Sequence, residues 1–172
     1  YRNVLSAYGI DFTPQLFVSL AGIPVFQTIG RLNVIFGKNM DPEIVGHLKE
    51  LEYERMMHQM KPVKPVVDLV YRYHQHLPMA IGTGGQKRLA RKTLEFLDLK
   101  PYFHILVASG DVANGKPHPE TFLRCARLLG VEPKYCQVFE DGEPGIQAAR
   151  EAGMISTLVT DFYNVTIGKD EI

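Results

Sequence analysis

The stretch Gln137-Val138-Phe139-Glu140-Asp141-Gly142 joins a short apolar run to two adjacent carboxylates and a glycine. Short apolar runs bounded by turn residues are typical of strands buried in a parallel sheet. A helical pattern follows at 145–151, and another apolar run follows at 155–159. This order of strand, helix and strand is the repeating unit of a parallel sheet with crossover helices, so the stretch predicts an α/β fold.

The same alternation extends from this stretch toward the N-terminus. The sequence predicts earlier strands at 79–81 and 105–108, and helices at 66–76, 87–97 and 120–129. Parallel strands joined by right-handed crossovers form a doubly wound layer. Such a layer binds ligands beyond the carboxyl ends of its strands, so we expect the functional residues directly after each strand.

Residues 1–62 show only helical periodicity, because their apolar residues recur at three- and four-residue spacing. Asp41 precedes a proline and is expected to cap a helix. Pro62 and Pro65 then interrupt helical propagation, since proline disfavours helical geometry in the residue before it. The sequence therefore predicts a small helical domain at 1–62 and an α/β domain at 63–172.

The composition argues against several classes of partner. The chain of 172 residues carries 19 basic and 19 acidic side chains, and 45% of its residues are hydrophobic. Binding to nucleic acid or to an anionic membrane draws on clustered Lys and Arg, so the zero formal charge argues against both partners. The longest apolar stretches fall far short of the roughly 20 residues that cross a bilayer. The two cysteines show no metal-ligand spacing, which fits reduced thiols in a cytoplasmic protein.

A hydroxyl and glycines follow the first predicted strand, in Gly82-Thr83-Gly84-Gly85. A predicted helix comes next, so the Thr83 hydroxyl and the backbone N–H groups of the turn can face a phosphate, with help from the helix dipole. Such a turn is more often a simple loop than a phosphate-binding site. No Walker lysine follows it, so the turn is not a P-loop.

Lys116 lies between Gly115, which is flexible, and Pro117, which is rigid, so the point where its side chain leaves the backbone is fixed. A solvated surface charge is the alternative interpretation of this lysine. Asp111 follows the second predicted strand, and it either supports Lys116 by charge pairing or serves only in the loop.

Glu140 and Asp141 supply the oxygen ligands that suit Mg²⁺, and an exposed acidic turn is the alternative. The combination of features favours chemistry over loops. The Thr83 hydroxyl, the Lys116 ammonium and the carboxylate pair come in chain order after strands of one predicted sheet. A phosphoryl group needs a hydroxyl or amide donor, a cation and a metal, so the sequence predicts a phosphoryl-binding site.

These motifs resemble those of the haloacid dehalogenase superfamily, in particular its helical-cap phosphatases and the relatives of β-phosphoglucomutase. Gly82-Thr83 is similar to the second family motif, 115–122 to the third, GKPxPxxF, and Phe139-Glu140-Asp141-Gly142 to the fourth. The resemblance implies a Rossmann-like core with a helical cap. It further implies that Thr83 and Lys116 are catalytic, that they bind the phosphoryl group together with Gly84, and that Glu140 and Asp141 bind Mg²⁺.

The resemblance also assigns roles to the N-terminal residues. Residues 1–62 correspond to the cap, and 20–24 resemble its substrate-facing loop, with Gly22, Pro24 and Gln27 as candidate substrate contacts. The first family motif, DxDGT, supplies the nucleophile and the general acid/base, yet no Asp-x-Asp occurs in the 172 residues. We expect this motif, together with the central strand of the sheet, upstream of Tyr1.

The function that the resemblance implies is a Mg²⁺-dependent phosphatase for a small phosphorylated metabolite such as a sugar phosphate, acting through an aspartyl phosphate. A phosphomutase of the β-phosphoglucomutase type shares the three motifs, but Val25 stands where the cap loop of that enzyme carries an arginine. Arg31 or Lys38 from the cap could compensate for that arginine. Carbon–halogen dehalogenation is disfavoured by the pair Glu140-Asp141, which its enzymes lack. A chain that naturally has no nucleophile would instead be a binding or regulatory module.

Overall fold

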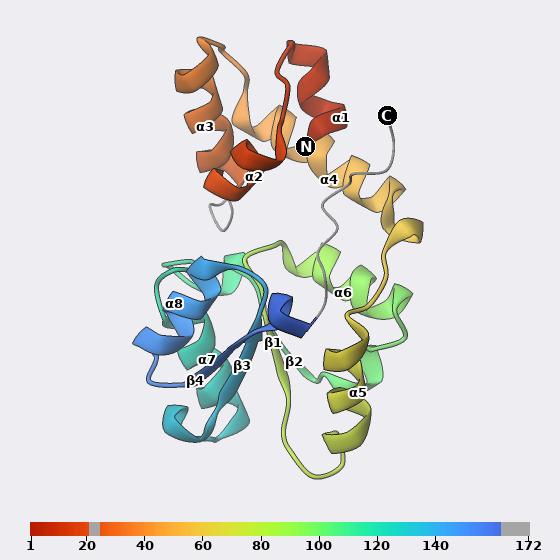
Figure 1. The fold of residues 1–172 in the computed structure, drawn as a ribbon, viewed down its shortest axis with the longest axis vertical. Helices are drawn as coiled ribbons and strands as arrows, with labels where there is room; N and C mark the ends of the chain where they lie inside the picture. The colour runs from red at the N-terminus through yellow and green to blue at the C-terminus, as the bar shows by residue number, and fades with distance from the viewer. Residues whose placement is uncertain (21–24, 163–172) are drawn as a thin grey trace. The chain divides into compact units, whose positions relative to one another are not determined.

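The computed structural model describes residues 1–20 and 25–162 (Figure 1). The chain divides into two compact units, which we call unit 1 (Tyr1–Met60) and unit 2 (Lys61–Ile172). The predicted boundary at 62 falls in the same proline-containing connection. No helix among the described residues is long and apolar enough to cross a membrane.

Unit 1 consists of helices and 3-10 turns in the residues that are described. These are α1 (Arg2–Leu5), η1 (Ser6–Tyr8), α2 (Pro14–Leu20), α3 (Val25–Phe36), α4 (Pro42–Arg55) and η2 (Met57–Gln59). The predicted cap of α4 is confirmed, because the Asp41 carboxylate accepts hydrogen bonds from the backbone N–H groups of Glu43 and Ile44 at 2.8 and 3.2 Å. This cap satisfies two of the donors that a helix leaves unpaired at its start.

The helices of unit 1 enclose a core of large apolar side chains. Its members are Leu5, Ile10, Phe12, Leu20, Ile29, Leu32, Met40 and Val45. Helices α3 and α4 pack against each other, and α1 packs against α4. Burial of apolar area is therefore what holds this unit together.

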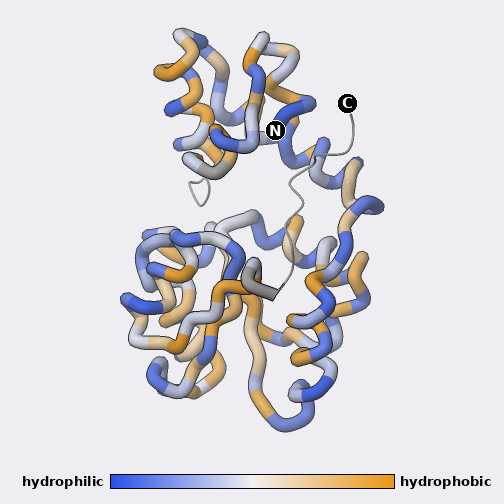
Figure 2. The backbone as a smooth tube through the Cα atoms, in the orientation of Figure 1, coloured by the Kyte–Doolittle hydropathy of each residue, from blue (hydrophilic) through white to orange (hydrophobic). Residues whose placement is uncertain are grey.

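Unit 2 alternates helices and short strands. Its elements are α5 (Lys64–Tyr73), β1 (Ala80–Gly82), α6 (Lys87–Phe96), η3 (Lys100–Tyr102), β2 (Ile105–Val107), η4 (Ser109–Asp111), α7 (Glu120–Leu129), η5 (Pro133–Tyr135), β3 (Gln137–Glu140), α8 (Glu143–Glu151), β4 (Ile155–Leu158) and η6 (Val159–Phe162). The predicted α/β class is confirmed, and hydrophobic residues lie along these strands (Figure 2). Helix α5 starts earlier than predicted because Pro65 sits in its first turn, where a missing N–H costs nothing.

The strands of unit 2 form two parallel pairs. β1 pairs with β2, so that Gly82 lies opposite Val107, and β3 pairs with β4, so that Glu140 lies opposite Leu158. Among the described residues, the two pairs share no hydrogen-bonded strand. The predicted site residues follow the carboxyl ends of these strands: Thr83 comes directly after β1, Lys116 lies in the loop after β2, and Glu140 ends β3.

Helix α7 connects the two strand pairs by packing. It contacts both β1 and β2, and its residues Phe122 and Ala126 share a core with Val138 of β3 and with residues of α8. The α8 side of this core is built from small residues, Ala148 and Ala149, which are fully buried. Small side chains allow α8 to approach β3 and α7 closely. Because α7 also packs on β1, it holds the ends of β1 and β3 in one unit.

Candidate active site

Thr83 lies in the turn between β1 and α6. Its backbone N–H donates to the Val107 carbonyl at 2.9 Å, which extends the β1–β2 pairing by one bond. Its Oγ1 accepts a hydrogen bond from the Gly85 N–H at 3.1 Å. Accepting this bond does not use the hydroxyl hydrogen, so Thr83 can donate to an anion. The neighbouring Gly84 is exposed, as a phosphate-binding turn requires.

Lys116 is drawn inward. Its Nζ forms an ion pair with Oε1 of Glu140, and the two side chains are only 13% and 11% exposed. The Nζ also lies 4.8 Å from the centroid of the Phe122 ring, which is within range of a cation–π contact. This lysine is therefore not a solvated loop charge, and its position is set by residues of β3 and α7.

Phe122 links the lysine to the turn that carries Thr83. A Cβ added to Gly82 would come within 3.1 Å of the Phe122 ring, so the backbone just before Thr83 rests on the ring that contacts Lys116. Phe122 is part of the motif at 115–122, but its contact with Lys116 could not be predicted from the motif alone. Its place as the last residue of the GKPxPxxF-like motif, in a predicted helix that starts directly after the Lys116 loop, was the available signal in the sequence.

Glu140 ends β3, and the start of α8 packs against it. A Cβ on Gly145 would overlap the Glu140 carboxyl group, so only glycine leaves room for that side chain. The second carboxylate oxygen of Glu140 accepts a hydrogen bond from the Asp141 N–H at 3.1 Å. The Asp141 side chain itself is exposed. The acidic pair thus divides into a buried, lysine-bound carboxylate and an open one.

Mg²⁺ is commonly held by one or two protein carboxylates together with several waters. Asp141 offers an open carboxylate at the end of β3, and Glu140 fits the same donor set only through the lone pairs that its bonds to Lys116 and to the Asp141 N–H leave free. Across residues 1–20 and 25–162, no group of three or more His, Cys, Asp or Glu side chains could hold a metal. A metal at this position therefore needs water or ligands beyond the described residues to complete its coordination.

Two further carboxylates brace the loop between β2 and α7. Glu120 accepts hydrogen bonds from the backbone N–H groups of Ala113 and Asn114 at 2.8 and 2.9 Å, and these bonds lower its pKa. Asp111 pairs with Lys87 at 2.8 Å. The suggested charge pairing of Asp111 with Lys116 is therefore wrong, because the start of α6 supplies a nearer cation.

A family profile described as "haloacid dehalogenase-like hydrolase" matches residues 18–153, which is most of the chain. The chain belongs to this family. The match covers parts of both structural units and all the predicted phosphoryl-site residues. The resemblance found in the three motifs is thereby confirmed.

This haloacid dehalogenase-like hydrolase has relatives whose names state an activity. It is 38% identical over 154 residues to fructose-1-phosphate phosphatase YqaB of Escherichia coli, covering 90% of this chain and 82% of that protein. It is 30% identical over 158 residues to a phosphorylated carbohydrates phosphatase of Thermotoga maritima, covering 90% and 72%. The crystal structure of β-phosphoglucomutase from Clostridium difficile superposes with a TM-score of 0.75 at 25% identity, covering 90% and 73%.

One of the three predicted cap contacts lies among the described residues. Gln27 is an exposed residue of α3. Gly22 and Pro24 lie outside the described residues. Their assignment as substrate contacts, like the roles of Thr83, Gly84 and Lys116, stays a prediction.

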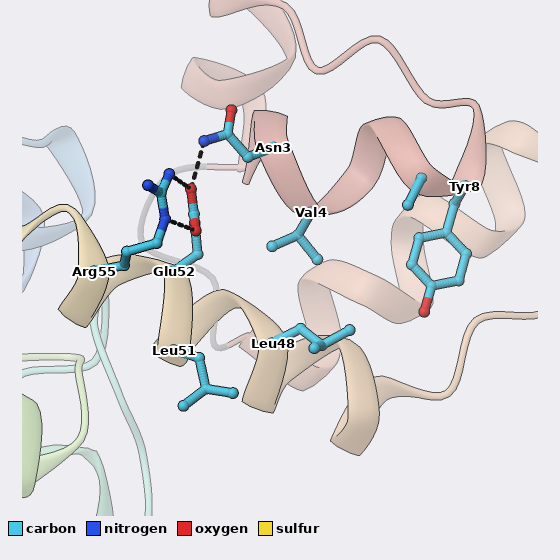
Figure 3. A pocket seen from close by; sticks show the side chains of 8 residues that line it. Asn3, Val4, Tyr8, Leu48, Leu51, Glu52 and Arg55 are labelled. Atoms are coloured by element: carbon cyan, nitrogen blue, oxygen red, sulfur yellow. Dashed lines mark hydrogen bonds and ion pairs between the residues drawn. The ribbon is translucent and has the colours of Figure 1, made fainter.

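Unit 1 of the hydrolase also contains a pocket of about 400 Å³ between α1, η1 and α4 (Figure 3). Asn3, Val4, Ala7, Tyr8, Leu48, Leu51, Glu52 and Arg55 line it. Arg55 donates two hydrogen bonds of 2.7 Å to Glu52, and Asn3 donates another, so the pKa of Glu52 falls to about 2. These polar groups satisfy one another, and the rest of the wall is mainly apolar. The pocket therefore presents no reactive group, and it belongs to a different unit from Thr83 and Lys116.

Proposed function

We propose that this hydrolase is a phosphatase that acts on a small phosphorylated metabolite, and specifically on a sugar phosphate. The observation that carries the proposal is the nearly buried Lys116, held between Glu140 and the Phe122 ring at the ends of the strands. A cation fixed in a site with little water stabilises the charge of a phosphoryl group far better than a mobile surface lysine. The relatives named as phosphatases of fructose 1-phosphate and of phosphorylated carbohydrates support the substrate class.

In the proposed reaction, the Thr83 hydroxyl and the backbone N–H of the exposed Gly84 hold two phosphoryl oxygens, and Lys116 balances their charge. The nucleophile that the family resemblance implies is the first aspartate of a DxDGT motif, and its carboxylate would attack phosphorus; no Asp-x-Asp occurs among the 172 residues. An O–P bond to that carboxylate forms while the ester O–P bond breaks, and the alcohol leaves with a proton from a neighbouring acid. Water then attacks phosphorus, releasing inorganic phosphate and the free carboxylate. Two displacements thus replace one difficult hydrolysis.

Glu140 and Asp141 are the residues that we propose for Mg²⁺ in this site. When bound, the ion neutralises negative charge on the phosphoryl oxygens. The free thiols of Cys125 and Cys136 fit a cytoplasmic setting for the reaction.

A phosphomutase is the second candidate, favoured by the 27% identity to β-phosphoglucomutase of Bacillus subtilis over 164 residues. A mutase needs a cap group that grips the second phosphate of its intermediate. At the start of α3, Val25 packs against the core of unit 1, and its Cγ1 comes 3.2 Å from the Cβ position of Gly46. An apolar side chain turned into the core cannot bind a phosphate, so the position of Val25 supports hydrolysis, and a mutase would have to use another cation of the cap, such as Arg31 or Lys38.

The test is a steady-state assay of the full-length protein on a panel of sugar phosphates that includes fructose 1-phosphate. We expect release of inorganic phosphate that needs Mg²⁺ and stops with EDTA. Failure to hydrolyse any member of the panel would contradict the phosphatase proposal and favour a binding module. Hydrolysis that persists in EDTA would contradict the metal assignment. With β-glucose 1-phosphate, formation of glucose 6-phosphate in place of phosphate would favour the mutase.

A further inference from the structure

The Thr83 turn is tied at three points to the last residue of β2 and to the segment that follows it. At its start, the Thr83 N–H donates to the Val107 carbonyl at 2.9 Å. In its middle, the Gly85 carbonyl accepts two hydrogen bonds from Ser109, one from the backbone N–H at 3.1 Å and one from Oγ at 3.2 Å. At its end, Lys87 Nζ reaches the Asp111 carboxylate at 2.8 Å.

Asp111 also organises its own segment. Its Oδ2 accepts a hydrogen bond from the Ala108 N–H at 2.9 Å, and its N–H donates to the Ala108 carbonyl at 2.9 Å. These reciprocal bonds fix η4, and with it the direction of the Ser109 N–H and hydroxyl. The side chain of Asp111 is 22% exposed, so water competes only in part. The bonds from Lys87 and Ala108 hold the pKa of Asp111 below its usual range, so the carboxylate stays charged near neutral pH.

We infer that Asp111 and Ser109 are positioning residues that hold the Thr83–Gly85 turn in the geometry that binds the phosphoryl group. Both residues lie on the β2 side of the site, and neither needs to touch the substrate. The turn has flexible glycines at 84 and 85, so its own sequence does not fix its conformation. We call the Ser109–Gly85 bonds and the Asp111–Lys87 ion pair the clamp. The clamp holds the turn after Gly84, while the bond from Thr83 to Val107 of β2 holds it before Gly84. This inference rests on the proposed phosphatase function, in which Thr83 holds a phosphoryl oxygen.

The main variant is Asp111→Ala, measured in the full-length protein with fructose 1-phosphate. A misplacement of a binding group by about 1 Å can reduce a rate by about a hundredfold, so we expect kcat/KM to fall by about tenfold or more. The matched control is Asp68→Ala, which breaks the exposed Lys64–Asp68 ion pair of α5, away from the predicted site. We expect that control to change kcat/KM by less than about twofold.

A double-mutant cycle with Thr83→Val separates positioning from a general loss of structure. If Asp111 acts through Thr83, removing the hydroxyl makes the clamp irrelevant. Asp111→Ala should then cost less than about twofold in the Thr83→Val background. Losses that multiply in the double variant would overturn the inference, and so would an Asp111→Ala variant that behaves like Asp68→Ala.

Two milder variants cover the case in which Asp111→Ala does not fold. Asp111→Asn keeps an acceptor for the Ala108 N–H but loses the ion pair with Lys87, and Ser109→Ala removes one of the two bonds to Gly85. Each should lower kcat/KM by several fold, and each loss should vanish in the Thr83→Val background. Wild-type protein without any activity would overturn the proposed function. Active wild-type protein with unaffected clamp variants would overturn only the positioning role.

Discussion

The two units achieve their order in different ways. Unit 1 fixes its helices by burying large apolar side chains, of which Leu5, Ile29 and Leu32 are completely inaccessible to water. Unit 2 has strands of three or four residues and a core rich in alanine. Its loops are fixed instead by ion pairs and hydrogen bonds at the ends of the strands. Apolar packing gives a stable shape, whereas fixed polar groups give a surface that can bind charge, which is why we propose the phosphoryl site in unit 2.

The comparison predicts its largest effect at Lys116. Lys116→Ala removes the fixed cation and leaves Glu140 without its partner, so kcat/KM for a sugar phosphate should fall by about 10²–10³-fold. The control is Lys100→Ala, which removes an exposed lysine paired with Glu95. Equal activity of the two variants would show that the lysine at 116 has no role in binding the phosphoryl group.

The core of unit 1 should respond in stability. Leu32→Ala creates a cavity at a fully buried position of α3 and should lower the free energy of unfolding by about 2–5 kcal/mol. Val34→Ala on the same helix is a matched control, because Val34 is 85% exposed and should change stability by less than about 0.5 kcal/mol. Urea denaturation followed by circular dichroism measures both. Similar values for the two variants would refute an apolar core in unit 1.

A glycine-to-alanine substitution should change the free energy of unfolding in opposite directions in the two units. Gly145→Ala in α8 adds a methyl group where the Glu140 carboxyl lies, and should destabilise the protein by about 1–3 kcal/mol. Gly30→Ala in α3 meets no atom within 4 Å and should stabilise the protein by about 0.5–1 kcal/mol, because alanine favours a helix. Thermal denaturation gives both signs. A stabilising Gly145→Ala would contradict the close approach of α8 to Glu140.

The cap of α4 predicts an effect of intermediate size. Asp41→Ala removes the acceptor for two backbone N–H groups and should lower stability by about 1 kcal/mol. The N-cap residue of α6, Gln86, makes no side-chain cap bond, so Gln86→Ala should leave the free energy of unfolding nearly unchanged. Equal losses at the two positions would show that side-chain capping does not distinguish the units.

The smallest effect should be a pH dependence at Glu52. Its pKa of about 2 lies below the ordinary glutamate value of about 4.3, so the unfolded chain binds the proton more readily. Its contribution to stability is therefore complete above about pH 5 and is lost as the pH falls toward 2. Unfolding measured from pH 6 to pH 3 should show a flatter acid slope for Glu52→Gln than for the wild type. Parallel slopes would contradict this ionised pair.

The strands could be predicted from the sequence, because the strands of parallel sheets typically have continuous runs of apolar residues. The Lys116–Glu140 contact could be suspected from the convergence of strand ends, but its depth could not. The burial of Lys116 and Glu140 depends on the Phe122 ring and on the absence of a side chain at Gly145. Both residues come from helices other than the segments that carry the ion pair, so their contacts appear only in the folded chain. Asp111 shows the same limit, since Lys116 is near it in sequence, whereas the lysine that pairs with it, Lys87, lies 24 residues away along the chain.

The connection between the units has a consequence for proteolysis. Exposed connections are where proteases ordinarily cut, and this one offers Lys61 and Lys64, both exposed. Each of these lysines is followed by proline, whose ring fixes the backbone and blocks cleavage by trypsin at that bond. A tryptic fragment of unit 2 prepared from folded protein is therefore expected to begin upstream of the connection and to retain it.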